Sequence, residues 1–190
     1  MGATCVESCG EKVLELVSSK LGATIKEPRL NLGDAEIKVL REGMLDIFRI
    51  LKIDSELSFN SLLDVTVVDW LDERECRFEV VYHLLSIYKL YRLRVKVLVP
   101  ENCAEVDSVC GLWSSAKFIE REAWDMYGIV FKGHPDLRRI LMYEEFEGHP
   151  LRKDYPVQGK QPRVKMRHVE VRNTAVDMKR NALVQINSRN

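Results

Sequence analysis

Apolar and polar residues alternate along three segments in the middle of the chain. In residues 91–99 an apolar residue at every second position alternates with arginine and lysine, and residues 78–84 alternate in a similar way. Residues 65–70 are rich in β-branched and aromatic side chains. These patterns predict three β-strands. The links between them are shorter than the roughly twelve residues that a parallel crossover needs, so we expect antiparallel neighbours.

Helical periodicity marks three further segments. Residues 11–21 and 41–52 each place their apolar residues on one helical face, and residues 114–127 do so before a glycine that can end a helix. Residues 23–26 and 35–39 predict a small strand pair. The fold expected is therefore α+β, an antiparallel or mixed sheet with helices packed on one face, followed by an irregular C-terminal partner-binding extension.

The last third of the chain shows little periodicity. After Gly128 it contains prolines, glycines and charged residues, with one predicted turn of helix at residues 135–141. Such a segment buries little surface on itself, so we expect it to pack against the domain or another protein. The predicted organisation is a core domain at residues 1–130, a charged segment at 131–156 and a basic arm at 157–190.

The charge distribution bears on possible partners. The chain has 29 basic and 29 acidic residues. Residues 150–190 hold ten basic and three acidic residues, a balance of +7, which leaves −7 for residues 1–149. A basic arm attracts phosphates, but this one lacks interleaved aromatic residues and is attached to an acidic body. We therefore expect that the arm does not bind nucleic acid. The alternative is that it docks onto an acidic surface of a partner protein.

Targeting and metal signals are weak. No stretch reaches the roughly 18 apolar residues of a transmembrane helix, and the N-terminus lacks a basic region followed by an apolar one. We expect a protein that is neither exported nor membrane-spanning. The five cysteines are scattered and form no CxxC pair, which is typical of reduced thiols. No nucleotide-binding glycine motif occurs either.

The segment from residue 120 offers candidates for acid–base chemistry. Glu120, Glu122 and Asp125, together with His134, could split their pKa values apart, as paired carboxylates do at active sites. However, Glu120 and Glu122 point in different directions on a helix, and Arg121 with Asp125 has the spacing of an ordinary ion pair. We therefore expect no catalytic residue in this chain.

The triplet Gly-His-Pro occurs twice, around His134 and His149. A metal site would need further ligands, and neither histidine has the spacing of a metal-binding motif. A residue before proline is restricted to extended backbone, and proline suits the first turn of a helix. We interpret both histidines as positioning residues and expect no metal or cofactor to be bound by this chain.

At residues 120–156 the chain resembles a known family. EREAWDMYGIVFKGHPDLRRIL followed by GHPLRKDYP is similar to the signature of the 30 kDa subunit, also called the C subunit, of NADH-quinone oxidoreductase (respiratory complex I). Residues 35–119 resemble the family more loosely. After Tyr155 the chain departs from the family pattern, so the contacts of the family's C-terminal tail cannot be transferred to it.

The resemblance implies a non-redox structural subunit of the peripheral arm, which supports electron transfer from NADH to quinone coupled to proton translocation. It implies that FMN, iron–sulfur clusters and quinone are bound by other chains, and that subunits D and B are the partners. It also implies membrane association only through the complex, on the cytoplasmic side of the bacterial inner membrane or the matrix side in mitochondria. The alternative is the homologous subunit of a membrane-bound hydrogenase or formate hydrogenlyase.

Charged residues and the two histidines of the signature are the candidates for a partner interface. We expect them to pair with partner groups and with each other, since charged pairs shielded from water are costly to break from one side. The candidates are Glu120, Arg121, Glu122, Asp125, His134, Asp136, Arg138, Arg139, His149, Arg152, Lys153 and Asp154.

Overall fold

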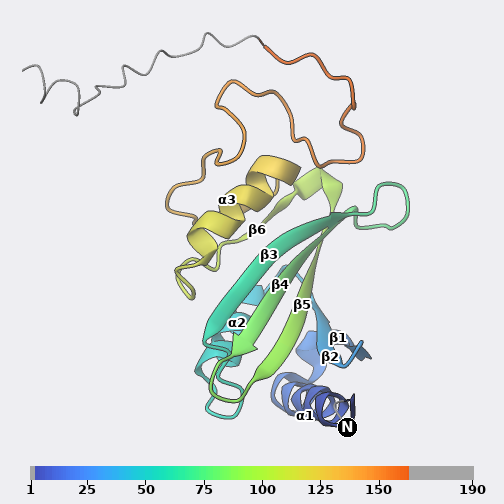
Figure 1. The fold of residues 1–190 in the computed structure, drawn as a ribbon, viewed down its shortest axis with the longest axis vertical. Helices are drawn as coiled ribbons and strands as arrows, with labels where there is room; N and C mark the ends of the chain where they lie inside the picture. The colour runs from blue at the N-terminus through green and yellow to red at the C-terminus, as the bar shows by residue number, and fades with distance from the viewer. Residues whose placement is uncertain (1–2, 163–190) are drawn as a thin grey trace, which may run out of the picture.

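The computed structural model describes residues 3–162, with side chains from Cys9 onward. These residues form a mixed sheet, three α-helices interleaved with its strands along the chain, and a long irregular segment after the last strand (Figure 1). The predicted basic arm lies outside the described residues from Arg163 onward. The elements are α1 (Ala3–Leu21), β1 (Ile25–Asn31), β2 (Asp34–Val39), α2 (Met44–Ile53), β3 (Ser61–Asp69), β4 (Phe78–Ser86), β5 (Tyr91–Val99), β6 (Glu105–Asp107), α3 (Ala116–Tyr127) and β7 (Val130–Lys132).

The main sheet has five strands in the order β1-β2-β5-β4-β3. The β3–β4, β4–β5 and β1–β2 pairs are antiparallel, and β2–β5 is parallel. The antiparallel β3–β4–β5 meander confirms the prediction drawn from the short links between these strands. The parallel pair arises because α2 and the first two strands of the meander lie between β2 and β5 in the chain, which leaves enough residues for a crossover. The predicted α+β class with a mixed sheet is confirmed.

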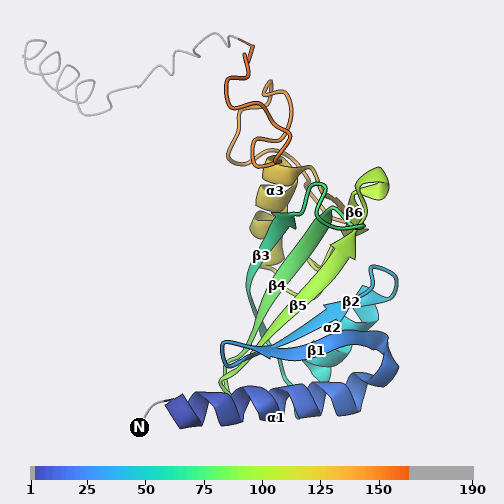
Figure 2. The same cartoon turned by 90° about the vertical axis from the view of Figure 1, so that its right-hand side faces the viewer.

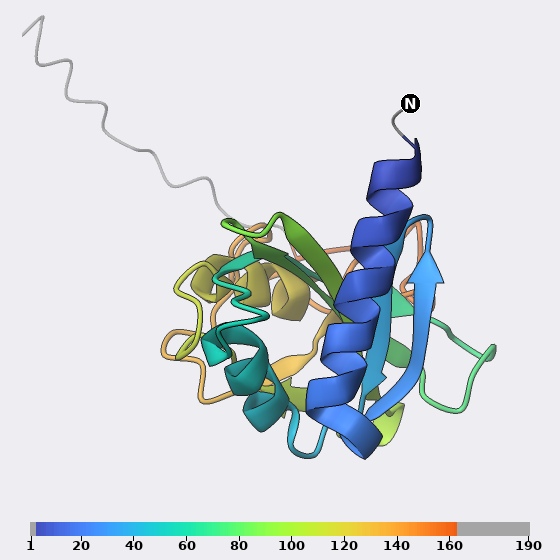
Figure 3. The same ribbon diagram turned by 90° about the horizontal axis from the view of Figure 1, so that it is seen from below.

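One face of the sheet forms the core. The apolar positions of β5 are buried, and Tyr82 of β4 lies beside Val95 on the same face. Phe48 of α2 packs on Tyr82 with ring centroids 4.7 Å apart and on Trp113 at 5.8 Å. The view from below shows α1 crossing the sheet end with α2 beside it (Figure 3). The buried apolar stripe of each helix thus covers the face that the alternation of β5 predicts.

The opposite face of the sheet carries an ionic cluster. The side chain of Glu36 on β2 is 1% exposed and bonds Arg29 of β1 at 2.6 Å and Arg94 and Lys96 of β5 at 3.1 and 3.0 Å. Burial by itself would raise the pKa of Glu36, but the hydrogen bonds from Lys96, Arg29, Asn31 and Arg94 lower it to about 2. Two basic side chains of β5 are thus bound by a buried carboxylate from the neighbouring parallel strand.

Several boundaries differ from those predicted. Helix α1 begins at Ala3, well before residue 11, and α2 begins at Met44, after Gly43 in the left-handed region. The predicted turn of helix at residues 135–141 is wrong, since no helix forms there. A second sheet, the parallel β6–β7 pair, was not predicted because strands of three residues are too short to show a period. Strand β7 also crosses residue 130, the predicted end of the core.

Replacing Glu36 with glutamine tests the ionic cluster. The ionised carboxylate stabilises the fold fully above its ordinary pKa of 4.5, and this contribution is lost as pH falls towards about 2. We expect Glu36→Gln to lower the free energy of unfolding by about 2 kcal/mol at pH 7. Urea denaturation should show the difference shrinking below about pH 4.5 and vanishing near pH 2. The control is Glu27→Gln, which removes the exposed ion pair with Lys38; an equal effect in both variants contradicts the interpretation.

Candidate functional site

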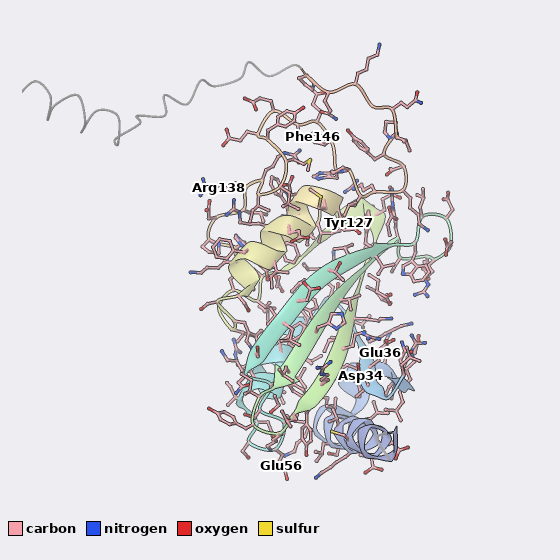
Figure 4. All side chains as sticks on the ribbon, in the orientation of Figure 1. Asp34, Glu36, Glu56, Tyr127, Arg138 and Phe146 are labelled. Atoms are coloured by element: carbon pink, nitrogen blue, oxygen red, sulfur yellow. The ribbon has the colours of Figure 1, made fainter. Side chains whose placement is uncertain are left out.

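Residues 133–162 contain neither helix nor strand, yet their backbone follows a defined path over α3 and one end of the sheet (Figure 1). We call these residues the strap. Backbone N–H and C=O groups must find hydrogen-bond partners wherever water is excluded. In the strap, many of these partners are side chains and backbone carbonyls of α3. Figure 4 labels Tyr127 of α3 and Arg138 and Phe146 of the strap, which lie at the same end of the molecule.

Asp125, which is fully buried on α3, organises the first half of the strap. Its Oδ2 accepts hydrogen bonds from the backbone N–H groups of Ile140, Leu141 and Met142 at 3.0, 2.8 and 2.9 Å. Its Oδ1 accepts a bond from Arg139 Nη1 at 2.6 Å. Burial would raise the pKa of Asp125, but the bonds from Met142, Arg139, Leu141 and Ile140 lower it below its ordinary value. The carboxylate takes the N–H groups that end the predicted helical turn, which explains why no helix forms there.

Two arginines reinforce this contact. Arg139, whose side chain is 13% exposed, also donates to the carbonyls of Phe146 and Gly148 at 2.7 and 3.1 Å. Arg121, one turn before Asp125 on α3, donates to the carbonyls of Arg138 and Arg139 at 3.0 and 2.8 Å. The predicted ion pair between Arg121 and Asp125 therefore does not form, and each side chain binds the strap instead. The aspartate binds backbone N–H groups of the strap and the arginine binds its carbonyls. Both the donors and the acceptors of this backbone segment therefore have partners.

The second Gly-His-Pro triplet caps the C-terminus of α3. The carbonyl of Asp125 accepts a bond from His149 Nδ1 at 3.0 Å, that of Met126 from the Leu151 N–H at 3.1 Å, and that of Tyr127 from Arg152 Nε at 2.5 Å. These carbonyls have no partner within the helix, because the last turn of any α-helix leaves them free. The positive charge of Arg152 also suits the negative end of the helix dipole.

A glycine allows the strap to cross the helix end. Gly128 has φ 76°, and a Cβ atom placed there would lie 2.5 Å from the His149 ring and 2.7 Å from Arg152 Nη2. Burial lowers the pKa of His149, so its neutral form is favoured, and the Nδ1 proton is donated to the helix. The position therefore requires glycine for both its backbone conformation and the close approach of the strap.

Arg77 joins the end of the strap to the sheet. It lies just before β4 and forms two 3.0 Å bonds with Asp69 at the end of β3, and it bonds Asp154 of the strap at 2.7 Å. Its third partner is Glu101, at 2.5 Å, and the Lys153 N–H also donates to Asp69 at 2.9 Å. Sequence reasoning did not select Arg77 or Asp69. The available signal was that both are charged residues directly flanking apolar strands.

Glu120 binds a loop outside the strap, at residues 108–110. It is fully buried on α3 and accepts bonds from Ser108 Oγ at 2.6 Å, the Val109 N–H at 2.8 Å and Cys110 Sγ at 3.3 Å. Burial raises the pKa of Glu120, and it raises that of Cys110 to about 11. Glu120 thus holds the loop that leads from β6 towards α3.

Cys110, Glu120 and His134 place one ligand-type atom each within 4.8 Å of one another. Both ring nitrogens of His134 are engaged, because Nδ1 accepts from the Asp136 N–H and Nε2 donates to the Lys117 carbonyl, each at 3.0 Å. Glu120 already binds three donors. A metal ion would have to displace these bonds, so the arrangement suits a hydrogen-bonded cluster better than a metal site. Glu122 and Asp125 do not belong to this group.

The remaining interface candidates lie at the surface. Asp136 and Arg138 form an exposed ion pair at 3.0 Å, and Lys153 pairs with exposed Glu73 at 2.8 Å. Glu122 is exposed and forms no ion pair among the described residues. The strap also exposes apolar side chains beside these charges. They are Ile140, Leu141, Tyr143, Leu151 and Val157.

The fold and the site together define an α+β domain whose C-terminal strap is fixed by buried charges and presents apolar and charged groups outward. The chain belongs to the family described as "Respiratory-chain NADH dehydrogenase, 30 Kd subunit", whose model matches residues 37–161. This confirms the resemblance identified from the signature at residues 120–156.

Relatives and solved structures agree with this family. The chain is 48% identical over 140 residues to the C subunit of NADH-quinone oxidoreductase from Geobacter metallireducens, covering 74% of this chain and 85% of that protein. It is 48% identical over 138 residues to the C 1 subunit of the same enzyme from Rhizobium etli, covering 73% and 68%. A solved structure of the "trypsin-resistant fragment (1-134)" of Nqo5 matches with TM-score 0.57 and 38% identity, covering 67% of this chain and 98% of that one.

A chain of the archaeal membrane-bound sulfane sulfur reductase, described as a respiratory membrane complex, matches with TM-score 0.66 and 26% identity, covering 78% of this chain and 86% of that one. Within residues 3–162, no helix combines the length and the apolar character that crossing a membrane requires.

Replacing Asp125 with asparagine tests the anchor. The variant leaves Arg139 and three N–H groups facing an uncharged amide, so we expect the strap to detach about a hundredfold more often. When the strap reattaches faster than trypsin cleaves it, the cleavage rate is proportional to the detached fraction. Trypsin should therefore cut after Arg138 and Arg139 about a hundredfold faster. Mass spectrometry of a digestion time course measures this. Asp136→Asn, which removes only an exposed ion pair, is the control, and equal rates for Asp125→Asn and the wild type contradict the anchor.

Proposed function

We propose that this chain is a non-redox structural subunit of the peripheral arm of NADH-quinone oxidoreductase. In this role it supports electron transfer from NADH to quinone coupled to proton translocation by holding neighbouring subunits in register. Membership of the 30 kDa subunit family is the observation that carries the proposal. The curated relatives carry the name of that enzyme's C subunit, so the hydrogenase or formate hydrogenlyase alternative is not favoured.

The strap supports a docking role. Its backbone is fixed by Asp125, Arg139 and Arg77, so its outward groups are held in place before a partner binds. A preorganised surface loses less conformational entropy on association. Apolar side chains such as Leu141 and Leu151 remain exposed between charged residues, which is the usual make-up of a partner-binding surface.

The proposed partners are subunits D and B beside the quinone site. FMN, the iron–sulfur clusters and quinone are then bound by other chains. Iron–sulfur clusters are generally held by cysteine thiolates, and the one close group of ligand-type atoms among the described residues contains a single thiol. The proposed location is peripheral, on the cytoplasmic side of a bacterial inner membrane or the matrix side of a mitochondrial one, with membrane association only through the complex.

Affinity purification of the full-length tagged chain, followed by mass spectrometry, tests the proposal. We expect the flavin-bearing NADH dehydrogenase chain and subunits D and B in the purified complex. A nickel–iron large subunit in their place would point to a hydrogenase. The chain purified alone should show no reduction of quinone by NADH, and turnover without other subunits would overturn the non-redox role.

The exposed Arg138 allows a sharper test. Its only ion pair among the described residues is with Asp136 at the surface, so Arg138→Ala should leave the melting temperature of the isolated chain unchanged. If Arg138 contacts a partner, the amount of assembled complex should fall about tenfold. Arg49→Ala, which removes a similar exposed ion pair with Asp46 on α2, is the matched control. Normal assembly and quinone reduction in Arg138→Ala would count against the proposed interface.

A further inference from the structure

His149 holds the strap against the C-terminus of α3, where its side chain is partly buried. The ring nitrogen Nδ1 lies 3.0 Å from the Asp125 carbonyl oxygen, and a carbonyl can only accept, so Nδ1 carries a proton and donates it. The ring also packs edge-on against Trp124 of α3, with centroids 6.4 Å apart. A neutral imidazole has a single N–H group, so the second ring nitrogen, Nε2, carries no proton in this form. The contact is therefore complete while the ring is uncharged.

Positive charge already surrounds this ring. Arg139 and Arg152 face it from the strap, and a Cβ atom at Gly128 would lie 2.6 Å from His149 Nε2 and 2.7 Å from Arg152 Nη2. The acidic group that faces the ring from α3 is Asp125, and its carboxylate already binds Arg139 and three backbone N–H groups. A charge on the ring would therefore add to two arginines that share one carboxylate.

Protonation of His149 would place its second N–H group on Nε2, next to Arg152. The C-terminus of a helix attracts positive charge, but the arginine already supplies that charge through its bond to the Tyr127 carbonyl. Burial, together with Arg152 and Arg139, lowers the pKa of His149 from the ordinary value of 6.5. In a detached strap the ring is solvated and regains its ordinary pKa, so protons bind preferentially to the detached form.

We propose that attachment of the strap depends on pH, and that a proton bound at His149 releases residues 148–152 from the end of α3. Because the pKa is lowered in the attached strap, attachment is most stable above pH 6.5 and weakens as pH falls below that value. Arg139 also bonds the Gly148 carbonyl, so release at the helix end reaches the Asp125 anchor of the first half of the strap.

The docking surface of the strap is then preorganised only while His149 is neutral. This consequence rests on the proposed function, whereas release itself is a property of this chain alone. The ordinary pKa of histidine lies close to neutral pH, so a modest acidification changes the charge of the ring. The strap and α3 lie at one end of the molecule and α1 at the other, and the core of the sheet between them provides an internal reference (Figure 2).

Hydrogen exchange of the full-length chain, followed residue by residue with NMR, tests the release. The probe is the Leu151 N–H, which bonds the Met126 carbonyl at 3.1 Å, and the reference is the Val95 N–H in the core of the sheet. Each rate is first corrected for the pH dependence of exchange itself. Between roughly pH 7.5 and 5.5, we expect the protection of Leu151 relative to Val95 to fall about threefold or more, within the limit of about tenfold per pH unit for one linked proton. A constant ratio would overturn the proposal.

Matched variants assign the effect to this ring. In His149→Asn the amide N–H takes the place of the Nδ1 donor, and an amide does not titrate in this range, so the relative protection of Leu151 should stay constant with pH. His134→Gln keeps a donor for the Lys117 carbonyl and removes the histidine of the other Gly-His-Pro triplet, and it should retain the pH dependence. Loss of the dependence in His134→Gln, or its persistence in His149→Asn, contradicts the assignment to His149.

A direct NMR titration of the His149 ring keeps the test valid if the asparagine variant does not hold the strap. We expect a midpoint below 6.5 in the wild type and a higher midpoint in Arg152→Gln, which keeps a donor near the Tyr127 carbonyl and removes the charge. A wild-type midpoint at or above 6.5 would sink the proposed release. If the strap responds to pH but purified complexes show no subunit bound to it, the proposed function fails and the release stands.

Discussion

The path of residues 133–162 depends mainly on the polar groups of α3. A segment of thirty residues without regular structure cannot satisfy its own backbone, and α3 supplies the missing partners (residues 133–162). Asp125 accepts N–H groups, Arg121 donates to carbonyls, and the exposed carbonyls at the helix end are capped by the strap in return. Helix and strap therefore stabilise each other.

Buried charges make this arrangement specific. An apolar contact between α3 and the strap would tolerate sliding by a residue, whereas Asp125 with Arg139, and Arg77 with Asp69 and Asp154, fix one register. Ion pairs of this kind contribute little net stability compared with apolar packing, but breaking one from a single side is costly. That property suits a chain whose surface must present groups at fixed positions. The same logic applies to Glu36, which fixes β2 against β5.

The sequence was most informative where periodicity was long. The alternation of β5 and the apolar face of α2 predicted the sheet, its core face and the α+β class, because burial of one face repeats over several residues. The strap could not be predicted in this way. Its path follows from bonds between residues far apart in the chain, such as Arg77 with Asp154, which leave no periodic trace. The helical turn predicted around Leu137 does not form for the same reason, since Asp125, 15 residues earlier in the chain, accepts the N–H group of Ile140.

The signature residues were identified as charged positions, but their main contacts were not foreseen. Asp125, Arg139, His149 and Arg152 bind within the chain, while Arg138 and Glu122 point outward. The charged motif of this chain thus combines two kinds of residue, those that build the surface and those that are exposed on it and can meet a partner. Only the second kind can contribute directly to recognition, whereas loss of the first kind would alter the whole strap.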